Sequence, residues 1–191
     1  MSSIVFMRGV NVGGHKAFRP SVIAERLDAL RVASIGAAGT FVVHSGASEA
    51  EIRRAFAKQL PFEARLMICS GRDVIALVEA DPFASRALPK ADGQFISILE
   101  SPTRKAPTLP LHVPEGRDWQ VAMTLIRGCF VATLMRRLGR TLLYPNEVVE
   151  KRLGVAATTR GWPTFLKIRQ ALETGSSPAV EPTRKRDRRR E

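Results

Sequence analysis

The order in which strand and helix patterns follow one another in residues 3–70 restricts the fold of this chain more than any other feature. Short β-branched and aromatic runs predict strands at residues 3–7, 32–36, 40–44 and 64–70. Between these runs, apolar residues at helical spacing predict one helix after Pro20 and another after Ser48. Ser48 and Glu51 have the spacing of a capping box. The resulting order, β-α-β-β-α-β, is typical of the split βαβ, or ferredoxin-like, arrangement.

The second half of the chain again combines apolar runs typical of strands with apolar residues at helical spacing. It predicts a helix at 71–80, strands at 94–99, 119–126 and 129–135, and helices at 145–153 and 162–172. Four prolines in residues 101–116 predict a loop or an edge connection. We therefore expect an α+β fold with two ferredoxin-like (alpha-beta plait) lobes in series. The expected parts are a first lobe at 1–86, a second lobe at 87–173 and a disordered basic tail at 174–191.

The chain carries a formal net charge of +12, from 30 lysines and arginines against 18 acidic residues. The three expected parts contribute +3, +6 and +3, so the positive charge is not confined to the tail. Positive charge favours contact with polyanions through counterion release, which makes nucleic acid a weakly supported candidate partner. Arg136, Arg137 and Arg140 follow a predicted strand, and we interpret them as a solvated surface rather than a nucleic-acid stripe.

The segment RGVNVGGHKAF, residues 8–18, directly follows the first predicted strand. Gly9 and Gly14 have the spacing of a Walker A phosphate loop, G-x-x-x-x-G-K-[ST]. His15, however, displaces the lysine by one position, and Ala17 replaces the hydroxyl, so nucleotide hydrolysis is disfavoured. A flexible loop of this kind can still bind an anion through its backbone amides. The candidate binding residues are Arg8, Asn11, Gly13, Gly14 and Lys16. The alternative is that the glycines only make a long connection and the cations are solvated.

A second segment, ATTRGWPTFLKI, occupies residues 157–168. Thr158 or Thr159 is expected to cap a helix that begins at Trp162. One interpretation assigns the binding of a carboxylate or phosphate to Thr159, Arg160 and Lys167. The alternative interpretation is that Trp162 is a core anchor against which Arg160 stacks.

Together, the two segments resemble a known family. An R-G-[IV]-N-V-G-G pattern after the first strand and a late T-T-R-N-W-N-T pattern are similar to domain-of-unknown-function family 1697, as is YPNEVVEKRLG at 144–154. The resemblance covers residues 2–173 and implies two ferredoxin-like lobes and a small bacterial protein, without an activity. The chain departs from the pattern at 37–40, where Ala-Ala-Gly-Thr replaces Q-S-G-N. It also departs at Gly161 and Pro163, where the family has asparagine.

No residue pattern indicates a catalytic centre, a metal site or a cofactor. The three histidines are scattered, and Cys69 and Cys129 lack the spacing of metal ligands, so we expect reduced thiols. No apolar run approaches the ~20 residues that span a bilayer. We therefore expect no membrane partner and a cytoplasmic location.

These observations predict a soluble module that binds a phosphate- or carboxylate-bearing ligand, or nucleic acid. The expected site is a cleft between the glycine-rich loop and the Thr-Thr-Arg motif. The alternative is an enzyme that acts on an anionic small molecule by a reaction that the sequence does not identify. A buried acid or base beside both segments would favour the enzyme.

Overall fold

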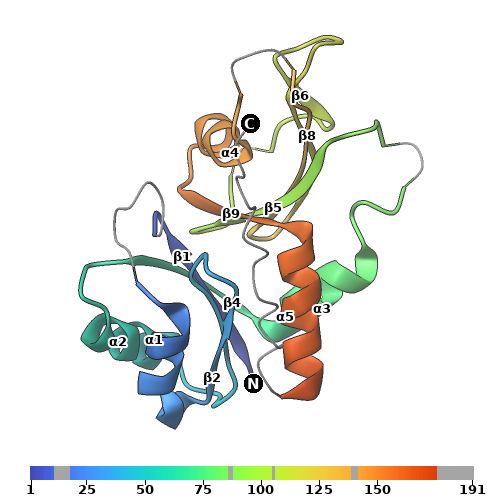
Figure 1. The fold of residues 1–191 in the computed structure, drawn as a ribbon. Helices are drawn as coiled ribbons and strands as arrows, with labels where there is room; N and C mark the ends of the chain where they lie inside the picture. The colour runs from blue at the N-terminus through green and yellow to red at the C-terminus, as the bar shows by residue number, and fades with distance from the viewer. Residues whose placement is uncertain (11–17, 86–87, 105, 139–141, 176–191) are drawn as a thin grey trace, which may run out of the picture.

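The computed structural model of this chain describes residues 1–10, 18–85, 88–104, 106–138 and 142–175. Its strands form one sheet of four strands and one of five, and neighbouring strands are antiparallel in both. Helices pack against both sheets (Figure 1). The α+β class is therefore confirmed. Most of the glycine-rich loop and of the expected tail lie outside the described residues.

The first sheet has the strand order β2-β3-β1-β4. The elements of this half are β1 (Ser3–Arg8), α1 (Pro20–Arg26), a 3-10 turn η1 (Asp28–Leu30), β2 (Val32–Ile35), β3 (Thr40–Val43), α2 (Glu49–Gln59), β4 (Arg65–Ser70) and α3 (Gly71–Ala80). This is the element order that the sequence predicts. Local signals support it: the Glu51 amide donates to Ser48 Oγ at 3.3 Å, and the Ser48 amide donates to Glu51 Oε2 at 2.8 Å. The predicted capping box is therefore present at the start of α2.

The second sheet has the strand order β6-β7-β8-β5-β9. The elements of this half are β5 (Gly93–Leu99), β6 (Leu111–Val113), β7 (Val121–Arg127), β8 (Phe130–Met135), α4 (Pro145–Leu153), β9 (Ala157–Gly161) and α5 (Trp162–Thr174). In the described residues, four strands follow one another without an intervening helix, so a second ferredoxin-like lobe is not confirmed. The proline-rich segment supplies the short edge strand β6 where that arrangement needs a helix, because proline interrupts helical hydrogen bonding.

The Thr-Thr-Arg segment is a strand and not a helix cap. Thr158 and Thr159 pair with Ile98 and Ser97 of β5. The N-cap residue of α5 is Gly161, which makes no side-chain capping bond. The start of the helix at Trp162 is confirmed, whereas the prediction of a threonine cap is wrong.

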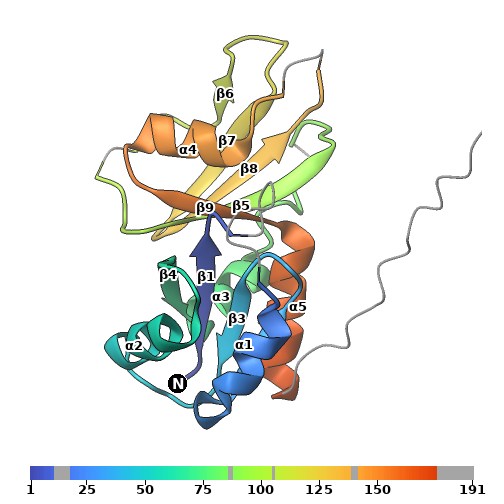
Figure 2. The same cartoon turned by 60° about the vertical axis from the view of Figure 1, so that its left-hand side comes forward.

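Helix α5 lies beside the first sheet and joins its core to that of the second (Figure 2). The Phe165 ring lies 5.7 Å from the ring of Phe6 in β1 and 6.2 Å from the ring of Phe130 in β8. On the opposite face of the first sheet, Val5 and Met7 pack with residues of α1 and α2, since side chains alternate along a strand. The buried core is thus continuous across residue 86, and the expected division into lobes stays a prediction.

Candidate functional site

The C-terminal end of β1 meets strand β9 at the junction of the two sheets (Figure 2). The two motifs singled out in the sequence therefore approach each other here. Thr158 is buried, and its hydroxyl donates to the carbonyl oxygen of Met7 at 3.3 Å. Arg8 and Arg160 extend from the two strands into the same region, and both make contacts across the junction.

Arg160 is buried, with only 8% of its surface exposed, and it links β9 to the first sheet. Its Nη2 donates to the carbonyl oxygens of Met7 at 2.7 Å and Ala38 at 2.6 Å. Its Nε donates to Thr40 Oγ1 at 2.9 Å. Its Nη1 donates to Thr158 Oγ1 at 2.8 Å and to the Thr159 carbonyl at 2.9 Å. A guanidinium has five N–H donors, and these five bonds use all of them.

The Arg160 charge is buried among neutral oxygen atoms. None of its five acceptors is a carboxylate. Burial lowers the pKa of Arg160 to about 10, a value at which the guanidinium still carries its charge at neutral pH. The guanidinium lies 5.9 Å over the ring of Phe6, while Trp162 packs with Phe83 and Phe165. In this arrangement Arg160 joins the sheets and offers no N–H to a ligand.

A tight turn between β2 and β3 brings the Ala38 carbonyl to Arg160. Gly39 in this turn has φ +67°, a conformation that strongly favours glycine. A Cβ atom at Gly39 would lie 2.8 Å from Val10 Cγ2 and 2.9 Å from Met7 Cβ. The turn therefore packs directly on the end of β1. In the segment that departs from the Q-S-G-N pattern, this glycine is retained and Thr40 supplies a hydroxyl to Arg160.

Arg8 pairs with Glu150 of α4 across the junction. Arg8 Nε lies 3.1 Å from Glu150 Oε1, and Arg8 Nη2 lies 3.1 Å from Glu150 Oε2. Arg8 Nε also donates to the Ala157 carbonyl at 3.1 Å, and the Ala157 amide donates to Glu150 Oε1 at 2.7 Å. The Arg8 side chain is 39% exposed, and within the described ranges its Nη1 has no hydrogen-bond acceptor. Unlike Arg160, this guanidinium has donors left for a ligand.

Thr159 belongs to a polar row beside the ion pair. Its Oγ1 lies 2.6 Å from the Oγ of buried Ser97 and donates to Asn146 Oδ1 at 3.1 Å. In the part of the chain that the structure describes, the Asn146 amide NH₂ has no acceptor. Asn146 and Glu150 are four residues apart, which places both on one face of α4. That spacing in YPNEVVE is the signal that sequence reasoning missed.

The structure brings together three of the eight candidate residues, Arg8, Thr159 and Arg160. Lys167 lies exposed on α5, and it makes no contact with this group among the described residues. The other four candidates are in the loop outside the described ranges: Asn11, Gly13, Gly14 and Lys16.

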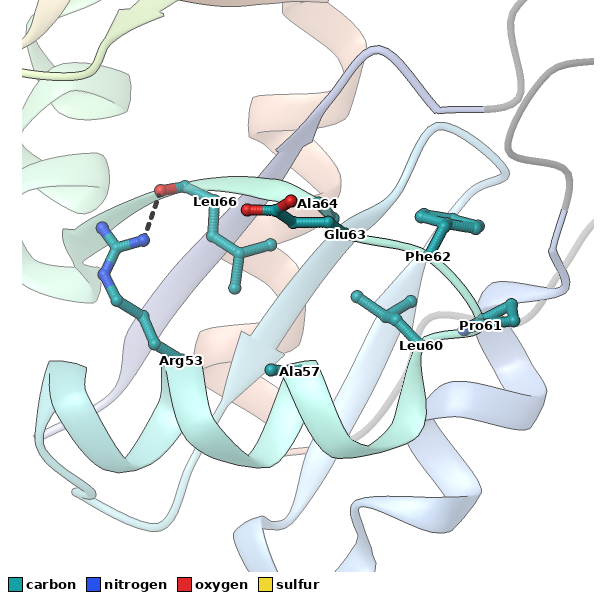
Figure 3. A pocket seen from close by; sticks show the side chains of 8 residues that line it. All are labelled: Arg53, Ala57, Leu60, Pro61, Phe62, Glu63, Ala64 and Leu66. Carbon is teal, nitrogen blue, oxygen red and sulfur yellow. Dashed lines mark hydrogen bonds between the residues drawn. The ribbon is translucent and has the colours of Figure 1, made fainter.

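Another hollow lies away from the junction, between α2 and the start of β4 (Figure 3). It has a volume of about 560 Å³ and contains none of the candidate residues. Arg53 on its wall donates to the Leu66 carbonyl at 2.9 Å and to Glu49 at 2.8 Å. The remaining lining is mainly apolar, including Leu60 and Phe62. This hollow is therefore separate from the junction.

The described residues contain no cluster of His, Cys, Asp or Glu that could hold a metal ion. Cys69 and Cys129 are free, and burial raises the pKa of both thiols, with a further contribution from Asp73. Both thiols are thus protonated at neutral pH. Among the described helices, none is long and apolar enough to span a membrane.

The family model described as "Protein of unknown function (DUF1697)" matches residues 1–124. The chain belongs to this family. A solved structure described as "The structure of conserved bacterial protein SP0830 from Streptococcus pneumoniae" is similar to this DUF1697 protein, with a TM-score of 0.52 and 18% sequence identity. The match covers 90% of this chain and 98% of that one, and at this identity it concerns the fold alone. No curated protein matches the sequence.

Proposed function

We propose that this DUF1697 protein binds a phosphate- or carboxylate-bearing ligand at the junction, with Arg8 as the main contact. The proposal rests on the position, exposure and hydrogen bonding of Arg8. Its guanidinium is held in place by Glu150 and is 39% exposed, and no described residue accepts a hydrogen bond from its Nη1. Arginine in a fixed orientation suits phosphate and carboxylate recognition, because its planar fork matches their oxygens.

The electrostatics of the junction favour an anion. Glu150 neutralises Arg8, but Arg160 has only neutral partners, so the three groups together carry one net positive charge. Arg160 is largely removed from solvent, where its charge is poorly screened by salt. We assign Arg160 a positioning role, with Arg8, the Asn146 amide and the following loop residues Asn11, Gly13, Gly14 and Lys16 as ligand contacts. Thr159 positions Asn146, and Lys167 is a peripheral cation.

The alternative, an enzyme that acts on an anionic small molecule, needs a free acid or base beside the ligand. Glu150 is the half-buried carboxylate closest to Arg8, and its oxygens accept bonds from Arg8 and from the Ala157 amide. A carboxylate held in this way acts as a structural partner. The geometry therefore favours binding over general acid–base catalysis.

Calorimetric titration with inorganic pyrophosphate and with succinate tests the proposal. The Arg8→Gln variant should bind the preferred anion at least about tenfold more weakly, since a hydrogen bond to a charged group contributes about 1.5–3 kcal/mol. The matched control is Arg169→Gln on α5. Arg169 is 43% exposed and also pairs with a glutamate, Glu173, so it has the same character away from the junction.

The control variant should bind the anion as the unchanged protein does. Circular dichroism of each variant separates a lost contact from a lost fold. The proposal is wrong if folded Arg8→Gln protein binds both anions with unchanged affinity, or if the Arg169→Gln variant loses the same affinity.

A further inference from the structure

A second arginine, Arg136, is held in position at the opposite end of β8 from the β7–β8 turn. Its guanidinium lies 4.6 Å over the ring of Trp119, and its Nη1 donates to the Arg117 carbonyl at 3.0 Å. The His112 ring stacks with Trp119 at 5.3 Å, with an angle of 19° between the ring planes. Arg136 thus stacks on Trp119, which in turn stacks with His112. It is not the freely solvated cation that the sequence predicts.

A hollow of about 350 Å³ lies against this guanidinium, lined by Lys90, Ala91, Asp92, Arg136 and Leu138. Trp119 is 5% exposed, and Arg136 both lies over its ring and lines the hollow. In the described structure, one of the five guanidinium N–H donors has a protein acceptor. This is the reverse of Arg160, where all five donors are bonded. The position of Arg136 is fixed while its donors stay available.

Asp92 adds an acceptor to the same hollow. Its Oδ2 accepts a hydrogen bond from the Arg137 amide at 2.7 Å, and its own amide donates to the Met135 carbonyl at 2.8 Å. These bonds anchor the carboxylate to the end of the second sheet. Within the described residues its Oδ1 has no hydrogen-bond donor. The hollow therefore offers fixed donors from Arg136 beside a fixed acceptor from Asp92.

We propose that this hollow binds a nucleoside phosphate whose base carries both an amino group and a carbonyl oxygen, as guanine and cytosine do. Arg136, whose guanidinium plane lies over Trp119, donates to the carbonyl oxygen of the base. Asp92 accepts from the amino group. Ala91 and Leu138 contact the base plane, and Lys90 pairs with the phosphate. The hollow is in the size range of small-molecule sites, about 300–1,000 Å³.

This site is independent of the function proposed for the junction, because it shares no residue with that site. A free nucleotide and one nucleotide of a single strand present the same base and phosphate groups to this site. Adenine offers Arg136 a ring nitrogen in place of the carbonyl oxygen, and the N3–H of uracil lies between two carbonyl oxygens that repel the Asp92 carboxylate. Both bases therefore match the two groups less well than guanine and cytosine do.

Calorimetric titration with GMP, CMP, AMP and UMP tests the inference on the full chain. GMP or CMP should bind about tenfold more tightly than AMP and UMP, because one charge-assisted bond is weakened for each of the latter two. Arg136→Gln should weaken the preferred nucleotide by at least about tenfold. A hexanucleotide of the preferred base separates the two sources: tighter binding per site than the mononucleotide identifies a single strand.

Asp92→Asn provides a second variant, because asparagine keeps the acceptor for the Arg137 amide. It should reduce the preference for GMP or CMP over UMP about tenfold while leaving the fold unchanged. Arg8→Gln and Arg169→Gln should bind nucleotides like the unchanged protein. The inference is overturned if the four nucleotides bind equally or not at all, or if folded Arg136→Gln or Asp92→Asn protein retains the full preference.

Discussion

Replacing Arg160 with methionine tests whether this residue joins the two sheets. Methionine keeps an unbranched apolar side chain and removes all five donors, which leaves three carbonyls and two hydroxyls without their partner. Two opposing terms set the size of the effect. One is the free-energy cost of burying the charge, and the other is the stabilisation that the hydrogen bonds contribute.

The cost of burial follows from the pKa of Arg160, which burial lowers from the usual arginine value to about 10. That fall corresponds to on the order of 3 kcal/mol, since a tenfold change in an ionisation constant is about 1.4 kcal/mol. Removing the charge recovers this cost. The Met7 carbonyl keeps the Thr158 hydroxyl as a donor. Each of the other four acceptors left without a donor costs about 1–3 kcal/mol, so four such losses exceed the recovered amount. Because water enters the vacated space and bonds some acceptors, we expect a net loss of about 3–5 kcal/mol in the free energy of unfolding.

Urea denaturation followed by circular dichroism measures this loss. Arg169→Met on the exposed face of α5 is the control and should change the free energy of unfolding by about 0.5 kcal/mol or less. Arg160→Lys, which retains the charge but has fewer donors, should be intermediate. A loss below about 1 kcal/mol for Arg160→Met would refute the reasoning, because it would mean that the five bonds do not exceed the burial cost.

Two further predictions concern the first half of the chain. Gly39→Ala should destabilise the protein by about 1–3 kcal/mol more than Gly36→Ala in urea denaturation. Both glycines have φ near +65°, but only the added Cβ at Gly39 meets another group, Val10 Cγ2 at 2.8 Å. Equal losses in the free energy of unfolding for the two variants would contradict this close packing. Burial, with a smaller contribution from the charge of Arg31, holds the pKa of His44 below 6.5. As the pH falls, His44 is therefore protonated in the unfolded chain before it is protonated in the folded one, so the free energy of unfolding decreases below pH 6.5. The His44→Phe variant should show a smaller decrease between pH 7 and 5. An unchanged pH dependence would exclude this role of His44.

Local patterns were sufficient for the elements of the first sheet. The capping box of Ser48 and Glu51 forms as the sequence predicts, because both partners lie within one helical turn. The strand at β1 likewise follows from its continuous apolar run, since such a run suits burial on both faces. The family was predicted from two short motifs, of which the first lies within the matched residues 1–124 and the second, at 157–168, lies outside them.

The tertiary structure alone decided what the Thr-Thr-Arg segment does. Threonine before a helix is a good capping residue, so the local pattern favours a cap, yet pairing with β5 makes these residues a strand. Similarly, Arg160 and Arg136 both read as available cations in the sequence. In the structure, all donors of Arg160 are bonded to groups more than 100 residues away or to its own strand neighbours. Arg136 instead stacks on a buried tryptophan, Trp119.

The physical reason is the range of the interactions. Periodicity and capping depend on neighbours a few residues apart, so the chain itself encodes them. The Arg8–Glu150 pair joins residues 142 positions apart, and its existence depends on how α4, β9 and the end of β1 dock. The sequence by itself therefore determined the strands and helices of the first sheet, the family and the candidate residues. Which guanidinium N–H groups remain open to a ligand was decided only when the two sheets packed together.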